Sequence, residues 1–174
     1  LEQSDSETKL SDGILNRATK ENVTPKVFYT NSSYEYYGRA ASLIHTTLDG
    51  RQDASLAKDT RIYLLAGSQH GPATFPPSRE RAQQMANPNN FRWSMRVLLL
   101  ALNSWVAEGK EPPPSRYPRL ADQNLTSLTD LKFPKIPGVQ LPERIQTAYR
   151  LDFGPNFRSE GIVSVEPPKV GEPF

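Results

Sequence analysis

His70 is the residue of this sequence whose setting best suits acid–base chemistry. It follows the apolar run at 61–66 and lies between Gly67 and Gly71, which permit tight turns and close approach of a substrate. In acyl transfer to a serine, an imidazole takes the proton of the attacking hydroxyl and returns it to the leaving group. A histidine at the end of a rigid strand meets that need, with a structural histidine bonded to loop backbone as the alternative.

Such a histidine needs a carboxylate that fixes its tautomer, and three acids compete for this role. Glu35 follows the preceding predicted strand and precedes His70 by 35 positions, which leaves room for a connecting element and one strand. Asp49 also follows an apolar run, although Asp49-Gly50 is more simply a turn, and Asp53 is more simply a loop acid. We favour Glu35 and keep Asp49 as the first alternative.

No serine of the sequence has the setting expected of the attacking nucleophile. Nowhere does the sequence contain G-x-S-x-G, the strained turn that exposes a nucleophilic serine. Ser68 is too close to His70 along the chain for an easy bond between its hydroxyl and the ring. Three other serines, Ser32, Ser33 and Ser42, lack the required turn. The sequence therefore predicts an acid and a base without their nucleophile.

Several classes of function are disfavoured by composition. The chain has 174 residues, no cysteine, and 21 basic against 19 acidic residues with no basic run, so we expect no nucleic-acid binding. No apolar run reaches the roughly 18 residues of a membrane span. The two histidines, His45 and His70, lack metal-site spacing, so we expect no metal and no cofactor.

The tyrosines around Glu35 are candidates for substrate binding. Tyr34, Tyr36 and Tyr37 could wall a substrate pocket or pack under the edge of a sheet. Arg39 could bind a substrate carboxylate or pair with a nearby acid. We take Tyr34, Tyr36 and Arg39 as the substrate-binding candidates.

Two strands and one long helix should position these residues. Segments 26–33 and 61–67 are rich in β-branched, aromatic and aliphatic residues, as in buried strands. Helical spacing then predicts a helix over 91–108, capped by Asn89 or Asn90 and ended by Gly109. Its apolar stripe consists of Phe91, Met95, Leu98, Leu102 and Trp105, and we expect Trp93 and Trp105 in the core.

The remaining segments are expected to be less regular. We predict a short helix through Ile14 to Ala18 that Ser11-Asp12 would cap, a hairpin over 43–54, a weak helix at 79–85 and a short strand within 161–167. Residues 1–10 read as disordered or connecting, and 11–110 as one domain. Residues 111–174 carry 11 of the 16 prolines and read as an extended tail on the surface.

Two motifs carry a family resemblance. The run Y-E-Y-x-G-R-A-A-S-L at 34–43 and the turn G-x-Q-H-G-P at 67–72 resemble a large, mostly bacterial α/β-hydrolase domain family, and the likeness extends over nearly all of the chain from about residue 12. The resemblance implies an α/β fold, here the last strands of the sheet with their flanking helices. It also implies Glu35 as the acid, His70 as the base, and a serine upstream of this segment.

The expected function follows from these residues and the resemblance together. The chain would be the acid- and base-bearing fragment of a serine hydrolase acting on carboxylic esters, inactive alone. The alternative is a non-catalytic binding or scaffold domain with a hydrolase-like fold. Because terminal strands cut from a parallel sheet expose an unpaired edge, we expect association with the missing N-terminal portion or with a second copy.

Overall fold

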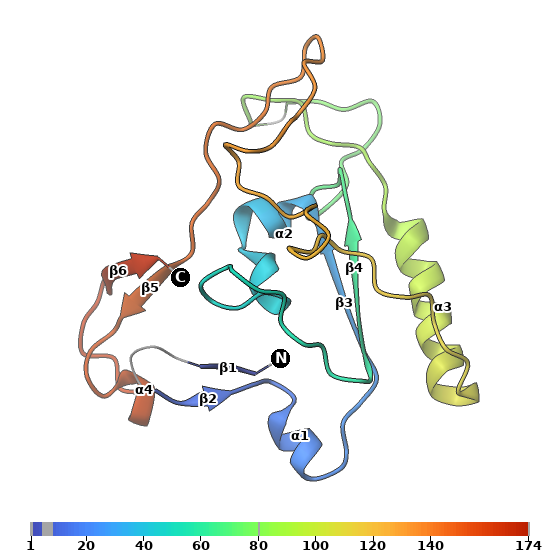
Figure 1. The fold of residues 1–174 in the computed structure, drawn as a ribbon. Coiled ribbons are helices and arrows are strands. Elements are labelled where there is room, and N and C mark those ends of the chain that lie inside the picture. The colour runs from blue at the N-terminus through green and yellow to red at the C-terminus, as the bar shows by residue number, and fades with distance from the viewer. Residues whose placement is uncertain (1, 5–8, 80, 174) are drawn as a thin grey trace.

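A two-stranded parallel sheet lies at the centre of the computed structural model, which describes residues 2–4, 9–79 and 81–173 (Figure 1). Strand β3 (Val27–Ser32) pairs with β4 (Thr60–Leu65) without a register shift. Both predicted strands are confirmed to within two residues. Because they run parallel, they end at the same edge, where helix α2 (Ser33–Gly38) follows β3 and the His70 loop follows β4.

The outer edge of β4 is covered by the segment that follows the long helix. Arg116 donates its N–H to the carbonyl of Ile62 and accepts the N–H of Leu64, both at 2.8 Å. The Ser115 hydroxyl accepts the N–H of Ile62 at 3.1 Å. Part of the proline-rich segment therefore acts as a short third strand beside β4.

The outer edge of β3 is open. In a parallel ladder, alternate residues direct their backbone groups to opposite sides. The N–H of Val27 donates to Asp59 on the β4 side, so Phe28 and Thr30 direct theirs away from β4. No backbone group of the described residues pairs with them there.

Helix α3 (Arg92–Glu108) packs on the central sheet through Trp105 of the predicted stripe, whereas Met95 of the same stripe is 37% exposed. Trp105 is 1% exposed, its ring lies 5.9 Å from that of Phe28, and Phe28 meets Tyr63 edge-on at 5.0 Å. Asn90 accepts the N–H of Arg92 at the start of the helix, and Gly109 ends it at φ 70°, a left-handed conformation that suits glycine. The helix is confirmed with both of its boundaries.

The other face of α3 is apolar and exposed. Trp93, expected in the core, is 66% exposed, so that expectation was wrong. The stripe needs only every third or fourth residue, and the run V-L-L-L-A-L places further apolar side chains outside it. These exposed side chains are Trp93, Val97, Leu99, Leu100 and Val106. No helix within the described residues is long and apolar enough to cross a bilayer.

The N-terminal elements differ from the expectation. Strands β1 (Gln3–Ser4) and β2 (Ser11–Asp12) form an antiparallel pair, so Ser11-Asp12 belongs to a strand and caps no helix. Helix α1 (Asn16–Lys20) begins later, after Leu15, which offers no capping side chain. Residues 5–8 of the segment expected to be disordered lie outside the described residues.

The predicted hairpin over 43–54 is present, but two other predicted elements are not. The 3₁₀ helix η1 (Ala41–Ile44) leads into an antiparallel bridge between Thr46 and Asp53. Residues 81–84 form a turn and bends and residue 85 is irregular where a weak helix was expected, and residue 80 lies outside the description. Isolated polar segments of this length seldom hold a helix without tertiary packing.

Near the C-terminus, the regular structure is a small antiparallel hairpin. Strand β5 (Tyr149–Asp152) pairs with β6 (Lys169–Pro173), and helix α4 (Phe157–Glu160) lies between them in the chain. The strand expected within 161–167 is absent from that segment. In Figure 1 the hairpin and α3 lie on opposite sides of the central strands.

The buried side chains of the central sheet should dominate stability. We expect Ile62→Ala to lower the free energy of unfolding by about 2–5 kcal/mol, because Ile62 is fully buried and the cavity left would refill poorly. Urea denaturation of the purified chain measures this. The matched control is Leu99→Ala, which shortens a side chain that is 66% exposed and should change stability by less than about 0.5 kcal/mol. Equal losses in the two variants would contradict this assignment of the core.

Candidate functional site

Glu35 is held in place by the start of helix α2. The Ser32 hydroxyl accepts the N–H of Tyr34 at 3.2 Å, and Oε2 of Glu35 accepts the N–H of Ser32 at 2.6 Å. Oε2 also bonds to the Ser32 hydroxyl. This reciprocal arrangement is a capping box, and its S-x-x-E signature stands at 32–35. The signature, which sequence reasoning overlooked, predicts the helix.

The His70 loop is tied to the same helix. Gly67 turns the chain out of β4 at φ 74°, a conformation that favours glycine. Its N–H donates to the Ser33 hydroxyl at 2.8 Å. Its carbonyl accepts the side-chain amides of Asn87 and Asn89 at 2.8 and 3.1 Å. These bonds fix the loop between the end of the sheet and the segment that precedes α3.

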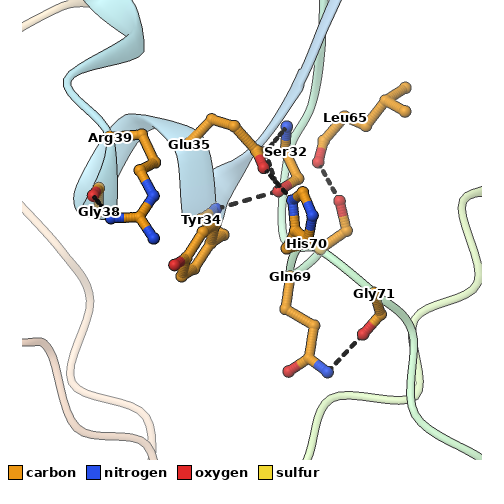
Figure 2. Close-up of polar contacts among 10 residues, drawn as sticks. Ser32, Tyr34, Glu35, Gly38, Arg39, Leu65, Gln69, His70 and Gly71 are labelled. Carbon is orange, nitrogen blue, oxygen red and sulfur yellow. Dashed lines mark hydrogen bonds and ion pairs between the residues drawn. The ribbon is translucent and has the colours of Figure 1, made fainter.

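Glu35 and His70 meet at the carboxyl ends of the two strands. Oε1 of Glu35 lies 2.6 Å from Nδ1 of His70, as Figure 2 shows. The Glu35 side chain is 21% exposed and that of His70 is 79% exposed. Within the described part of the chain, Nε2 of His70 has no hydrogen-bond partner. A carboxylate on Nδ1 places the ring proton there and leaves Nε2 as the acceptor.

The surroundings of Glu35 keep its carboxylate ionised. Burial works to raise the pKa of Glu35, but hydrogen bonds from the Ser32 side chain, the His70 ring and the Ser32 backbone outweigh it. The net result is a pKa below the ordinary value of a glutamate. Glu35 is therefore negatively charged at neutral pH and can stabilise a protonated His70.

Tyr34 lies beside the His70 ring, and Arg39 lies beside Tyr34. The centroid of the Tyr34 ring is 5.6 Å from that of His70, and the Arg39 guanidinium is 5.4 Å from the same Tyr34 ring. Figure 2 shows Tyr34 between the other two side chains. No acid of the described residues pairs with the Arg39 guanidinium. The alternative role expected for Arg39, an ion pair with a nearby acid, is therefore not found among these residues.

Tyr36 points elsewhere. Its hydroxyl bonds to Nε2 of His45 at 2.7 Å, and His45 is fully buried beside Tyr117, with ring centroids 4.5 Å apart. Burial raises the pKa of Tyr36 and lowers that of His45, so both side chains stay neutral. Among the described residues, no group of three potential ligands could hold a metal ion. Tyr36 is thus not brought together with Tyr34, Arg39 and His70.

The competing acids are engaged away from His70. Asp49 accepts the Thr47 hydroxyl at 2.6 Å and the N–H of Arg51 at 3.1 Å within its own turn. Asp53 accepts the backbone N–H groups of Leu120 and Ala121, each at 2.9 Å. Of the three candidate acids, Glu35 is the one that contacts the ring.

The serines of the site are also engaged. Ser68 is 3% exposed and its hydroxyl donates to the carbonyl of Leu65. The hydroxyls of Ser32 and Ser33 bond to Glu35 and to the N–H of Gly67. None of them bonds to His70. The described residues therefore supply an oriented imidazole, and none of these three serine hydroxyls bonds to it.

We expect the pKa of Glu35 to rise when its partners are removed. In Ser32→Ala, the carboxylate loses a hydrogen bond that favours its charged form, so the midpoint of its titration should move up toward the ordinary glutamate value of about 4.3. Because the native pKa lies below the unfolded one, Glu35 stabilises the fold above the unfolded pKa, and this contribution is lost as the pH falls through the native value. Carbon-13 NMR of the Glu35 carboxyl in both proteins measures the midpoint, and a native midpoint above the ordinary value would refute the arrangement.

The chain matches the family model of the alpha/beta hydrolase domain over residues 1–152. No curated protein and no solved structure matches it. The matched span includes β3, β4, α3 and both members of the Glu35–His70 pair. Because the match covers most of its length, the chain belongs to the α/β-hydrolase domain family.

Proposed function

We propose that this chain supplies the acid and the base of a serine hydrolase that acts on carboxylic esters, and that the serine comes from an N-terminal portion of the same protein. The observation that carries the proposal is the 2.6 Å bond between Glu35 and Nδ1 of His70, with Nε2 open at the carboxyl ends of two parallel strands. In open α/β sheets, ligands bind at this end of the strands.

The proposed reaction uses Nε2, the ring nitrogen of His70 that does not contact Glu35. The serine hydroxyl would approach Nε2, which accepts its proton while the oxygen attacks the carbonyl carbon of the ester. Glu35 stabilises the imidazolium that forms. His70 then gives the proton to the departing alkoxide, and a water molecule repeats the two steps on the acyl-enzyme to release the acid.

Two side chains are proposed to contact the substrate. Tyr34 offers an aromatic surface beside His70, and Arg39 stacks on that ring without an acidic partner in the described residues. A guanidinium that has no acidic partner among the described residues, next to Tyr34, favours an ester that also carries a carboxylate. Tyr36, on the opposite side of α2, is left out of this contact.

The open edge of β3 is the proposed attachment point of the N-terminal portion. Two parallel strands seldom form a stable sheet by themselves, because parallel sheets are buried on both faces. Among the described residues, nothing pairs there with the backbone groups of Phe28 and Thr30, and the buried Nδ2 of Asn31 has no hydrogen-bond partner. We infer that residues 11–110 form the C-terminal end of the hydrolase sheet and that 111–174 wrap around it as a proline-rich tail.

A non-catalytic scaffold remains the alternative because no described serine bonds to His70. A fluorophosphonate probe separates the two functions. Labelling of the full-length protein at a serine outside these residues supports the hydrolase, and a complete absence of labelling supports the scaffold.

In the full-length protein, His70→Ala should lower kcat for ester hydrolysis by at least about 10³-fold, because the nucleophile loses its general base. Glu35→Gln should lower kcat by a smaller factor, since the base loses its orienting charge. The matched control is Asp49→Asn, which removes a carboxylate that does not contact His70 and should leave kcat unchanged. Turnover retained in His70→Ala would remove this residue from the mechanism.

The exposed edge should make the isolated chain associate. We expect sedimentation velocity to show dimers or larger species of the 174-residue chain, and Thr30→Pro to reduce them, because proline removes an N–H from the outer edge while the β3–β4 bonds remain. The variant Leu99→Glu, on the exposed face of α3, tests the other apolar surface. A wild-type chain that stays monomeric at high concentration and binds no hydrophobic dye would overturn this proposal.

A further inference from the structure

A cavity lies on the side of α2 that faces away from His70. It has a volume of about 360 Å³ and is bounded by α2, the end of β4 and the returning segments at 118–131 and 145. Ser33, Tyr36 and Tyr37 line it, and His70 and Glu35 do not. At roughly 100° per helical residue, these three side chains project to the side opposite Tyr34 and Glu35. The cavity is therefore separate from the proposed catalytic pair.

The walls of this cavity carry no charge. Its apolar surface comes from Leu64, Leu128, Leu131 and Ile145 together with the two tyrosine rings. Its polar groups are hydroxyls and one side-chain amide, and no aspartate, glutamate, lysine, arginine or histidine lines it. A charged ligand would lose its hydration without gaining an ionic partner, whereas an uncharged one with a hydroxyl or carbonyl group could be satisfied.

Bonds on both sides anchor the segments that form the walls of the cavity. Asp53 fixes the backbone of Leu120 and Ala121 at one end of the returning segment. The N–H of Gln146 donates to the carbonyl of Tyr37 at 2.9 Å at the other end. Small-molecule sites are largely preformed and have volumes of about 300–1,000 Å³, so this cavity falls at the small end of that range.

We propose that this cavity is a binding site for a small, uncharged and mainly apolar molecule with one hydroxyl or carbonyl group. Binding at this site requires neither His70 nor a serine nucleophile. Its ligand bridges α2 to the returning segment, so binding stabilises the helix that carries Glu35. This site thereby offers a route by which a second molecule acts on the proposed catalytic pair.

The test compares three cyclohexane derivatives that are similar in shape and differ in charge. We expect cyclohexanol to bind the 174-residue chain saturably, with shift changes in ¹⁵N-resolved NMR that centre on Tyr36, Tyr37 and Leu128 and spare His70. Cyclohexanecarboxylate and cyclohexylammonium should bind at least about tenfold more weakly, because the cavity offers no counter-charge. Equal affinity for all three probes, or no saturable binding, would overturn the proposal.

Two variants locate the binding. Leu128→Trp should fill the cavity and weaken cyclohexanol binding at least about tenfold, and Leu131→Phe serves in its place if circular dichroism shows that the first variant is unfolded. The control, Leu99→Trp, makes the same change on the exposed face of α3 and should leave affinity unchanged. Binding that is lost in the control instead would place the ligand on α3 and refute the site. Loss of binding in the full-length protein would show that another segment of the protein fills the cavity, which would also refute it.

Discussion

The Glu35 carboxylate is the contact on which the candidate site depends, because its two oxygens perform two tasks. One oxygen accepts the N–H and the hydroxyl of Ser32 and so stabilises the start of α2. The other meets Nδ1 of His70. Helix α2 therefore exists in this position partly through the same side chain that orients the imidazole. An acid on a free loop would lose conformational entropy on pairing, whereas this one is already ordered by the helix that it caps. The Glu35–His70 pair is thus preorganised by local structure.

The sheet supplies the second half of this arrangement through the direction of its strands. Because β3 and β4 are parallel, α2 and the His70 loop leave the sheet at the same edge, and the bond between Gly67 and Ser33 joins them directly. The two outer edges of the sheet differ in how their backbone groups are paired. Arg116 pairs with the edge of β4, whereas no backbone group of the described residues pairs with Phe28 or Thr30 at the edge of β3. The sheet thus has a covered edge at β4 and an open edge at β3. Glu35 lies in α2, the helix that follows β3.

The sequence was most informative where local chemistry decides local structure. The apolar run before Gly67 predicted β4 and its turn, and helical spacing predicted α3 with its ends, because burial and capping act over a few residues. The prediction that Trp93 lies in the core was wrong, because the sequence of a helix with apolar residues on all sides does not reveal which face packs. The bond between Tyr36 and buried His45, and the pairing of Arg116 with β4, join segments with no periodic signal. Such contacts depend on the tertiary path of the chain, which spacing alone cannot supply.

Specific contacts fix the proline-rich region to the rest of the fold, and its composition does not reveal them. Proline disfavours regular helices and central strands, so such a segment must satisfy its backbone through other groups. Here Asp53 accepts two of its N–H groups, Tyr117 packs on His45, and Tyr37 accepts a third N–H from Gln146. These anchors bring the region against the face of α2 that Glu35 does not use. One face of the helix consequently faces the imidazole and the other faces a cavity with an uncharged lining, so changes in packing on the second face act on the element that positions the acid.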